Sequence, residues 1–266
     1  MLFKKQKCVS CDTYYDPTLE QCPECHKNNP NYTNRGISKD IVYLHPAAQV
    51  GLFLVGFAYI GMLISEIIFT ICFRSLENEI YRKTIILTAT YLMMFAGLLT
   101  IVFTTRRKVF FKKFTRPTDY IYGLAYAITI VCVSGVVSSI VSLIHPVADN
   151  NNQEAAIQIA KNYPIIALFI LGTVGPLCEE LTYRVGLYSF LRRIHKWVAI
   201  PVTVIIFALI HFDFTSSDMV TELLSLPSYI AAGAVLTIAY EHRGPACSMT
   251  AHMIYNTFAF ILMLLK

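Results

Sequence analysis

Residues 175–191 read GPLCEELTYRVGLYSFL and place three charges inside a long apolar run. Two adjacent carboxylates, Glu179 and Glu180, are followed one helical turn later by Arg184. One charge at the centre of a membrane helix costs about 2.5–3.5 kcal/mol on insertion scales. A charged group in such a segment is by default a functional-site hypothesis, so we take these three residues as the start of a candidate site.

Helical geometry predicts different surroundings for the two glutamates. Positions four apart lie on one face of a helix, so Glu180 can pair with Arg184. Glu179 lies about 100° around the helix from its neighbour, because a turn takes about 3.6 residues. We therefore expect the arginine to neutralise Glu180 and leave Glu179 facing a cavity. The alternative is a helix end whose three charges sit among lipid headgroups.

The composition is that of a membrane protein. The chain has 266 residues, of which 55% are hydrophobic and 15% charged, and its mean hydropathy is +0.53. A soluble domain carries about 25% charged residues. The net charge of +5 comes from basic residues concentrated at helix ends, where anionic headgroups explain them, so no nucleic-acid partner is predicted. We expect an all-α polytopic membrane protein in contact with membrane lipids, without a cleavable signal.

The first 40 residues form a separate unit in this interpretation. They contain four cysteines in two Cys-x-x-Cys pairs, Cys8 with Cys11 and Cys22 with Cys25. Four thiolates at about 2.3 Å suit tetrahedral Zn²⁺, so we predict a small zinc-ribbon-like module with structural zinc. Disulfides are the alternative, and His26 is expected to be exposed. A polar linker then leads to a membrane domain over 41–266.

Seven apolar runs predict about seven transmembrane helices, near 48–73, 84–105, 119–145, 163–183, 198–213, 226–240 and 247–265. The fifth and sixth are short for a bilayer, which takes about 20 residues. Basic residues gather in 106–116 and again at Arg192, Arg193 and Lys196, whereas 146–162 and 212–225 are acidic. The basic loops and the N-terminus should therefore be cytoplasmic, where cysteines stay reduced, as zinc requires. We expect the plasma membrane of a prokaryote.

Isolated polar residues recur in the later runs. The fifth run contains His211, and the seventh contains His252 and Asn256, four positions apart on one helical face. With Glu179, these residues supply what peptide hydrolysis needs: a carboxylate to take a proton from water, His211 to hold that water, and His252 with Asn256 to donate to an oxyanion. Alternatively, Glu179 and the two histidines could hold a catalytic zinc. Spacing alone leaves both possibilities open.

Three motifs now carry a resemblance, namely Glu179-Glu180-x-x-x-Arg184, Phe207-x-x-x-His211 and His252-x-x-x-Asn256, in this order on successive apolar segments. Over roughly 163–260 the chain resembles the CPBP family, also called Abi, which comprises CAAX prenyl endopeptidases and bacteriocin-processing intramembrane proteases. The resemblance implies a helical intramembrane endopeptidase with a cytosol-facing cavity.

The resemblance also implies a role for each residue. Glu179 would be the water-activating base, His211 its partner, and His252 with Asn256 the oxyanion group, with Glu180 and Arg184 in support. Members are often called metalloproteases, although a metal-free glutamate mechanism is also proposed. The substrate would be a peptide or protein, with prenylated CAAX proteins and leader peptides equally allowed. The cysteine module is an addition whose role cannot be carried over.

One condition applies to this assembly. Glu179 and His211 meet only if the fourth helix continues past Arg184 and the fifth is short or tilted. The apolar segment 185–191 permits the extension.

Two other hypotheses stay open: a non-catalytic scaffold or immunity-type protein that uses the cavity for binding, and a transporter with a proton relay. The lack of an inverted repeat counts against the transporter.

Overall fold

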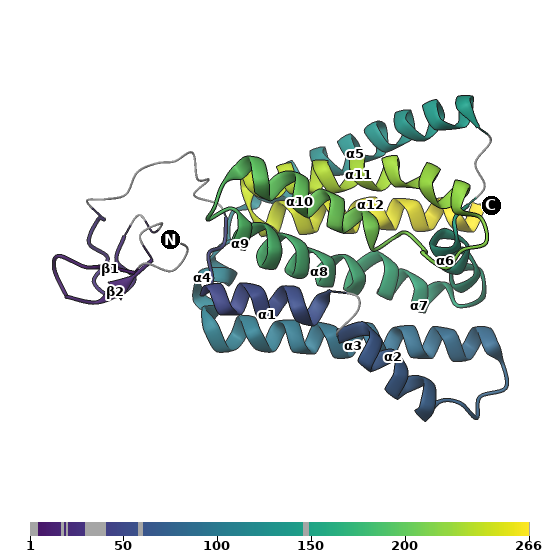
Figure 1. The fold of residues 1–266 in the computed structure, drawn as a ribbon, viewed down its shortest axis with the longest axis horizontal. Helices are drawn as coiled ribbons and strands as arrows, with labels where there is room; N and C mark the ends of the chain where they lie inside the picture. Colours follow the sequence, from purple (N-terminus) through teal and green to yellow (C-terminus); the bar gives the residue numbers. More distant parts are fainter. Residues whose placement is uncertain are drawn as a thin grey trace.

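The computed structural model describes residues 5–16, 19, 21–29, 41–57, 61–145 and 149–265. At one end lies a small β-hairpin, in which β1 (Gln6–Lys7) pairs antiparallel with β2 (Tyr14–Tyr15). Helices make up most of the rest (Figure 1). The expected boundary at residue 40 falls in 30–40, outside the described residues, so the two-domain division stays a prediction.

Five helices are long and apolar enough to cross a membrane: α3 (Glu79–Thr105), α5 (Pro117–Ile144), the continuous helix Pro164–Leu191, α11 (Met219–Arg243) and α12 (Pro245–Leu265). Two further apolar helices are shorter, α1 (Pro46–Gly56) and α10 (Lys196–Leu209). The remaining ones are α2 (Gly61–Cys72), α4 (Arg107–Lys112) and α6 (Asn151–Asn162). The all-α membrane fold is confirmed, whereas the count of seven spans is not.

The first predicted span is wrong as a single helix. The run 48–73 is divided into α1 and α2, and the backbone at Phe57 is extended, with φ −69° and ψ 124°. Apolar composition alone does not reveal such a break, because both pieces are equally hydrophobic. The fourth and sixth spans are longer than predicted, because the helices continue over Pro164–Leu191 and Met219–Arg243.

The helix Pro164–Leu191, called the site helix below, has an uneven backbone. It runs through α7 (Pro164–Phe169), the π-helical η1 (Ile170–Val174), α8 (Gly175–Glu179), the π-helical η2 (Glu180–Tyr188) and α9 (Ser189–Leu191). Pro176 accounts for the first irregularity, because it lacks an N–H group and its ring clashes with the carbonyl four residues earlier, which lies in η1. π-Bulges of this kind occur frequently at functional sites.

The site helix is the centre of the bundle. In its most apolar 18-residue window 56% of the residues are buried, compared with 17–33% in the other four long helices. Its glutamates lie near its middle, and it extends past Arg184 to Leu191. The helix that follows, α10, is short. The condition for a meeting of Glu179 and His211, a long fourth helix followed by a short fifth one, is therefore met.

The last two helices are joined by a single residue. α11 ends at Arg243 and α12 begins at Pro245, with Gly244 between them at φ 79°. Only glycine adopts such a conformation readily, so the turn can be this short. The two helices therefore run antiparallel (Figure 1), and α12 carries His252 back along the site helix.

The basic segments lie at one end of the bundle. Figure 1 shows α4 and α9 at the end that carries the hairpin, with α6 and the C-terminus at the other. Arg193, just beyond α9, forms an ion pair with Asp16 of the cysteine module. It also donates hydrogen bonds to Leu44 O at 2.7 Å and to Gln49 Oε1 at 2.9 Å. This arginine thus ties the module, the start of the membrane part and the site helix together.

The grouping of basic segments makes the orientation testable. A cysteine introduced at Thr115, in the basic loop, should react with a membrane-impermeant thiol reagent only from the cytoplasmic side. A cysteine at Ser216, in the acidic loop, should react only from outside. Labelling of intact cells and inverted vesicles, with the parent protein as background control, measures both. The reverse pattern would overturn the orientation.

Candidate active site and metal centre

A buried ion pair lies at the centre of the site helix. Arg184 Nη1 is 2.8 Å from Glu180 Oε1, and both side chains are fully buried. This is the pair that the four-residue spacing predicts. The same Glu180 oxygen lies 3.0 Å from His252 Nδ1, which comes from α12. One carboxylate oxygen therefore contacts groups on two helices, and the charge on Glu180 is compensated inside the protein.

The guanidinium of Arg184 is held by two further helices. Its Nη2 donates to Gly233 O on α11 at 3.2 Å, and its Cζ lies 4.3 Å from the centre of the Phe207 ring on α10. A β-carbon at Gly233 would lie 2.8 Å from Phe207 Cδ1, so only glycine lets α11 approach this ring. Arg184 thus stacks as a cation on an aromatic face.

Glu179 is placed differently from Glu180, as the helical geometry predicts. Its Oε2 is buried and has no hydrogen-bond partner among the described residues. That oxygen lies 3.7 Å from His252 Nε2, too far for a direct hydrogen bond. The two ring nitrogens of His252 therefore face different glutamates, Glu180 at contact distance and Glu179 across a short gap.

His211 lies two residues beyond the end of α10 and is half-buried. Its Nδ1 is 3.0 Å from Phe207 O, and since a carbonyl only accepts, Nδ1 carries the proton and Nε2 is an acceptor in the neutral ring. The imidazole stacks on Tyr229 with ring centres 4.4 Å apart. No hydrogen bond joins it to Glu179, and both residues lie in the described part of the chain. The Phe207 ring contacts both imidazoles, that of His211 and that of His252.

Asn256 has a partner that the sequence did not reveal. Its Nδ2 donates to Leu171 O at 2.9 Å, a backbone carbonyl within the π-helical segment η1. This bond fastens α12 to the site helix and uses one of the two N–H groups of the amide. An amide nitrogen carries two hydrogens, so Asn256 has a second N–H donor.

The loop that carries His211 is held by a buried carboxylate. Glu222, in the first turn of α11, is 1% exposed and accepts hydrogen bonds from Asp213 N and Asn151 N, each at 3.1 Å. Asn150 Nδ2 lies 3.4 Å from the same carboxylate and 3.2 Å from His211 O. Sequence reasoning placed Glu222 in an acidic loop. The sequence offered one signal for this role of Glu222, namely an acidic residue just before an apolar run.

Asp213 also helps to hold the loop. Asn151 donates to one of its oxygens at 2.7 Å, and Thr215 donates to the other from its backbone and its hydroxyl. These hydrogen bonds, with that from the Asn151 side chain foremost, hold the pKa of Asp213 below its ordinary value. Asp213 therefore accepts these hydrogen bonds as a charged carboxylate at neutral pH.

The four N-terminal cysteines form one cluster. Their sulfur atoms all lie within 4.8 Å of one another, and all four cysteines are free thiols. Cys8 Sγ is 3.6 Å from Cys25 Sγ, and Cys11 Sγ is 3.5 Å from Cys22 Sγ. Tetrahedral coordination at 2.3 Å needs sulfurs about 3.8 Å apart, so the cluster fits a metal ion of this size.

The two cysteine pairs also repeat one backbone geometry. Asp12 N donates to Cys8 O, and His26 N donates to Cys22 O. Both donors have positive φ, 59° and 57°, and each directly follows the second cysteine of its pair. This equivalence explains why His26 is exposed, because its position belongs to the turn.

The cluster is the one grouping in the described part of the chain that brings three or more potential ligand atoms within 4.8 Å. Glu179, His211 and His252 share a region of the bundle without meeting this distance. A metal held by all three would require a shift of side chains.

Comparison with known proteins now adds independent findings. Residues 161–258 match the family described as type II CAAX prenyl endopeptidase Rce1-like. The chain is 26% identical over 153 residues to the UPF0177 protein YvdC of Lactococcus lactis subsp. lactis (strain IL1403), which covers 57% of this chain and 55% of that protein. It is 31% identical over 123 residues to the membrane-embedded CAAX protease MroQ of Staphylococcus aureus (strain USA300), covering 43% and 46%.

The chain thus spans about half the length of the curated relatives that it matches. No solved structure matches it. The matched region contains every residue of the three motifs, from Glu179 to Asn256, and the helices that hold them are buried against one another in an integral membrane protein. Residues 161–258 are thus similar to the Rce1-like type II CAAX prenyl endopeptidases, and a membrane-embedded CAAX protease is among the relatives of this chain.

Proposed function

We propose that this protein is an intramembrane endopeptidase in which Glu179 activates water. The observation that carries the proposal is the contrast between the two glutamates. Both glutamates have a buried Oε2 without a hydrogen-bond partner, but among the described residues only Glu180 is also held by an ion pair with Arg184 at 2.8 Å and a hydrogen bond with His252 at 3.0 Å. An acceptor such as Glu179 Oε2, beside a histidine nitrogen at 3.7 Å, is suited to take a proton from a water molecule.

The remaining residues have matching roles in this proposal. The acceptor nitrogen Nε2 of His211 would orient the water while its Nδ1 stays bonded to Phe207 O. The water oxygen attacks the peptide carbonyl as its proton moves to Glu179, and that proton then passes to the leaving nitrogen as the C–N bond breaks. The second N–H of Asn256 would donate to the oxyanion. His252 Nε2 would also donate when both ring nitrogens carry a hydrogen, because Nδ1 donates to Glu180 Oε1. Glu180 and Arg184 position His252.

Glu179→Gln is expected to lower kcat for peptide cleavage by about 10²–10⁴, because the amide keeps the shape but cannot take a proton. The melting temperature and peptide binding should be unchanged. A cleavage assay with a peptide library on detergent-purified protein measures the effect. Glu154→Gln is the matched control, because it removes a carboxylate from an exposed turn of α6.

Two results would contradict this division of roles. Normal cleavage by the Glu179→Gln protein would remove Glu179 from the mechanism. A Glu180→Gln protein that is stable but inactive, next to an active Glu179→Gln protein, would exchange the roles of the two glutamates. Failure of the unaltered protein to cleave any peptide would instead favour a binding function for the same residues.

We also propose that the cysteine cluster holds structural zinc, on the strength of its sulfur distances and its two equivalent turns. Cys22→Ser is then expected to reduce bound zinc from one ion per chain to none and to unfold the module, because metal binding supplies the folding free energy of such units. Cys72→Ser, which alters an exposed cysteine of α2, should keep its zinc. Elemental analysis and circular dichroism measure both.

Retention of one zinc ion per chain in Cys22→Ser protein would place the metal elsewhere. Glu179, His211 and His252 would then become the ligand set to test, and catalysis would be zinc-dependent.

Under the present proposal the substrate is a peptide or protein, prenylated or not. The cysteine module faces the cytoplasm of a prokaryotic cell, and the protein resides in its plasma membrane.

A further inference from the structure

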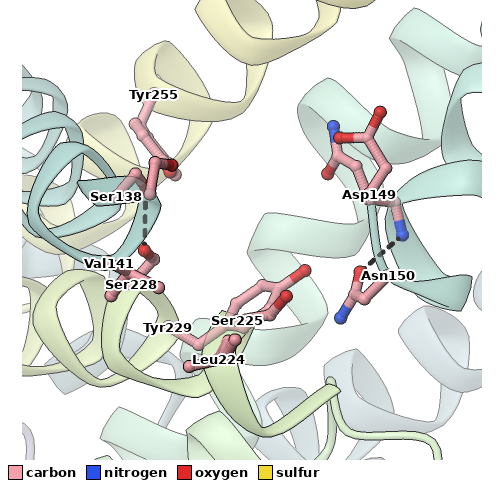
Figure 2. Close-up of a pocket in the computed structure, with 11 residues that line it drawn as sticks. Ser138, Val141, Asp149, Asn150, Leu224, Ser225, Ser228, Tyr229 and Tyr255 are labelled. Atoms are coloured by element: carbon pink, nitrogen blue, oxygen red, sulfur yellow. Dashed lines mark hydrogen bonds between the residues drawn. The ribbon is translucent and has the colours of Figure 1, made fainter. Parts of the chain in front are cut away.

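A polar pocket lies beside His211, on the side away from the cysteine cluster. It has a volume of about 290 Å³ and is bounded by α5, α6, α11 and α12. In Figure 2, Ser138 and Ser228 lie on one side and Asp149 and Asn150 on the other, while Tyr229 extends between them. The end of α5 diverges from α11 and α12 in this part of the bundle (Figure 1).

The lining of this pocket is mainly neutral and polar. Hydroxyl and amide groups dominate, with one carboxylate, Asp149, and no basic side chain among its described residues. Two of the hydroxyls, on Ser138 and Ser228, are bonded to each other at 2.9 Å across α5 and α11. Polar groups between membrane helices are expensive unless water or a polar ligand satisfies them. The lining is therefore better suited to a polar ligand than to an apolar one.

The pocket is in direct contact with the surroundings of His211. Tyr229 lines it and stacks on the imidazole with an angle of 21° between the rings. Asn150 lines it and donates to His211 O. Tyr255, also in the lining, is adjacent in sequence to Asn256. A ligand in this pocket would therefore end close to the groups proposed for catalysis.

We infer that the pocket is a subsite for an unmodified segment of the peptide substrate, bound by hydrogen bonds from its backbone and polar side chains. This inference rests on the proposed endopeptidase function and deepens it. A peptide offers N–H and C=O groups that pair with hydroxyls and amides. An isoprenoid chain offers none, so it would gain no hydrogen bond from this lining.

The volume agrees with a short segment. Pockets for whole small-molecule ligands span roughly 300–1,000 Å³, so 290 Å³ would hold only a few residues of a longer chain. The absence of basic side chains from the described lining makes a carboxylate or phosphate a poor ligand, and Asp149 would favour a neutral or basic side chain. The pocket thus selects for polarity in the substrate.

Two matched pairs of variants test this inference. Ser142→Leu fills the pocket from α5, whereas Ser139→Leu makes the same change at a residue that does not line it and whose hydroxyl donates to Gly135 O. Gln153→Leu removes an amide from the α6 wall, and Gln158→Leu is its control on the same helix. Each is introduced into Glu179→Gln protein, reconstituted in nanodiscs so that bound peptide is not cleaved.

The probe is a fluorescent pool of random decapeptides, used unmodified and with a C-terminal farnesyl-cysteine, and binding is followed by anisotropy. Ser142→Leu and Gln153→Leu should each weaken binding of both pools by at least about tenfold, equivalent to about 1.4 kcal/mol. The two controls should stay within about twofold. Since farnesylated peptides also place unmodified residues in the pocket, they should lose affinity equally.

Three results would overturn the inference: no binding of either pool, equal binding by pocket and control variants, or an effect confined to the farnesylated pool. The last result would assign the pocket to the isoprenoid chain. The proposed function is tested separately, by cleavage with protein that retains Glu179. Pocket-sensitive binding without cleavage would sustain the subsite and reject the protease.

Discussion

The buried pair of Glu180 and Arg184 is the interaction on which the rest of the structure depends. Two charges in a membrane bundle are tolerated only when their contacts replace the water that they lose. Arg184 therefore contacts Gly233 O on α11 and the Phe207 ring on α10, and Glu180 contacts His252 on α12. The contacts of this one ion pair join four helices, and the candidate site lies where these helices meet.

The same requirement separates the two adjacent carboxylates. Because Glu180 takes the contacts with Arg184 and His252, Glu179 is left with an unpartnered oxygen facing His252 Nε2. The π-helical segments contribute to this arrangement. One contains Glu180 and Arg184, and the other provides the Leu171 carbonyl that binds Asn256. Irregular backbone thus fixes the positions of three of the motif residues, as π-bulges at functional sites commonly do.

Short-range geometry could be predicted from the sequence, whereas contacts between distant segments could not. The pairing of Glu180 with Arg184 and the clustering of the cysteines follow from local rules. The predicted span 163–183 left out the helical extension through 185–191, which the sequence only permitted. The break at Phe57 and the bond from Asn256 to Leu171 O depend on tertiary packing, which periodicity does not encode. Pro176, inside an apolar run, was a local signal for the irregular helix. The roles of the site residues stay proposals.

The most direct test of the central claim is a double-mutant cycle on Glu180 and Arg184, measured as the free energy of unfolding in mixed micelles. Each single change to Gln should cost about 3–5 kcal/mol, because it leaves a buried charge unpaired. The double change should recover about 2–3 kcal/mol of their sum. Glu79 and Lys83 provide a control, because they form an ion pair with the same spacing at 2.7 Å but are mostly exposed, and their coupling should stay below about 0.5 kcal/mol. Equal coupling in both pairs would contradict the account.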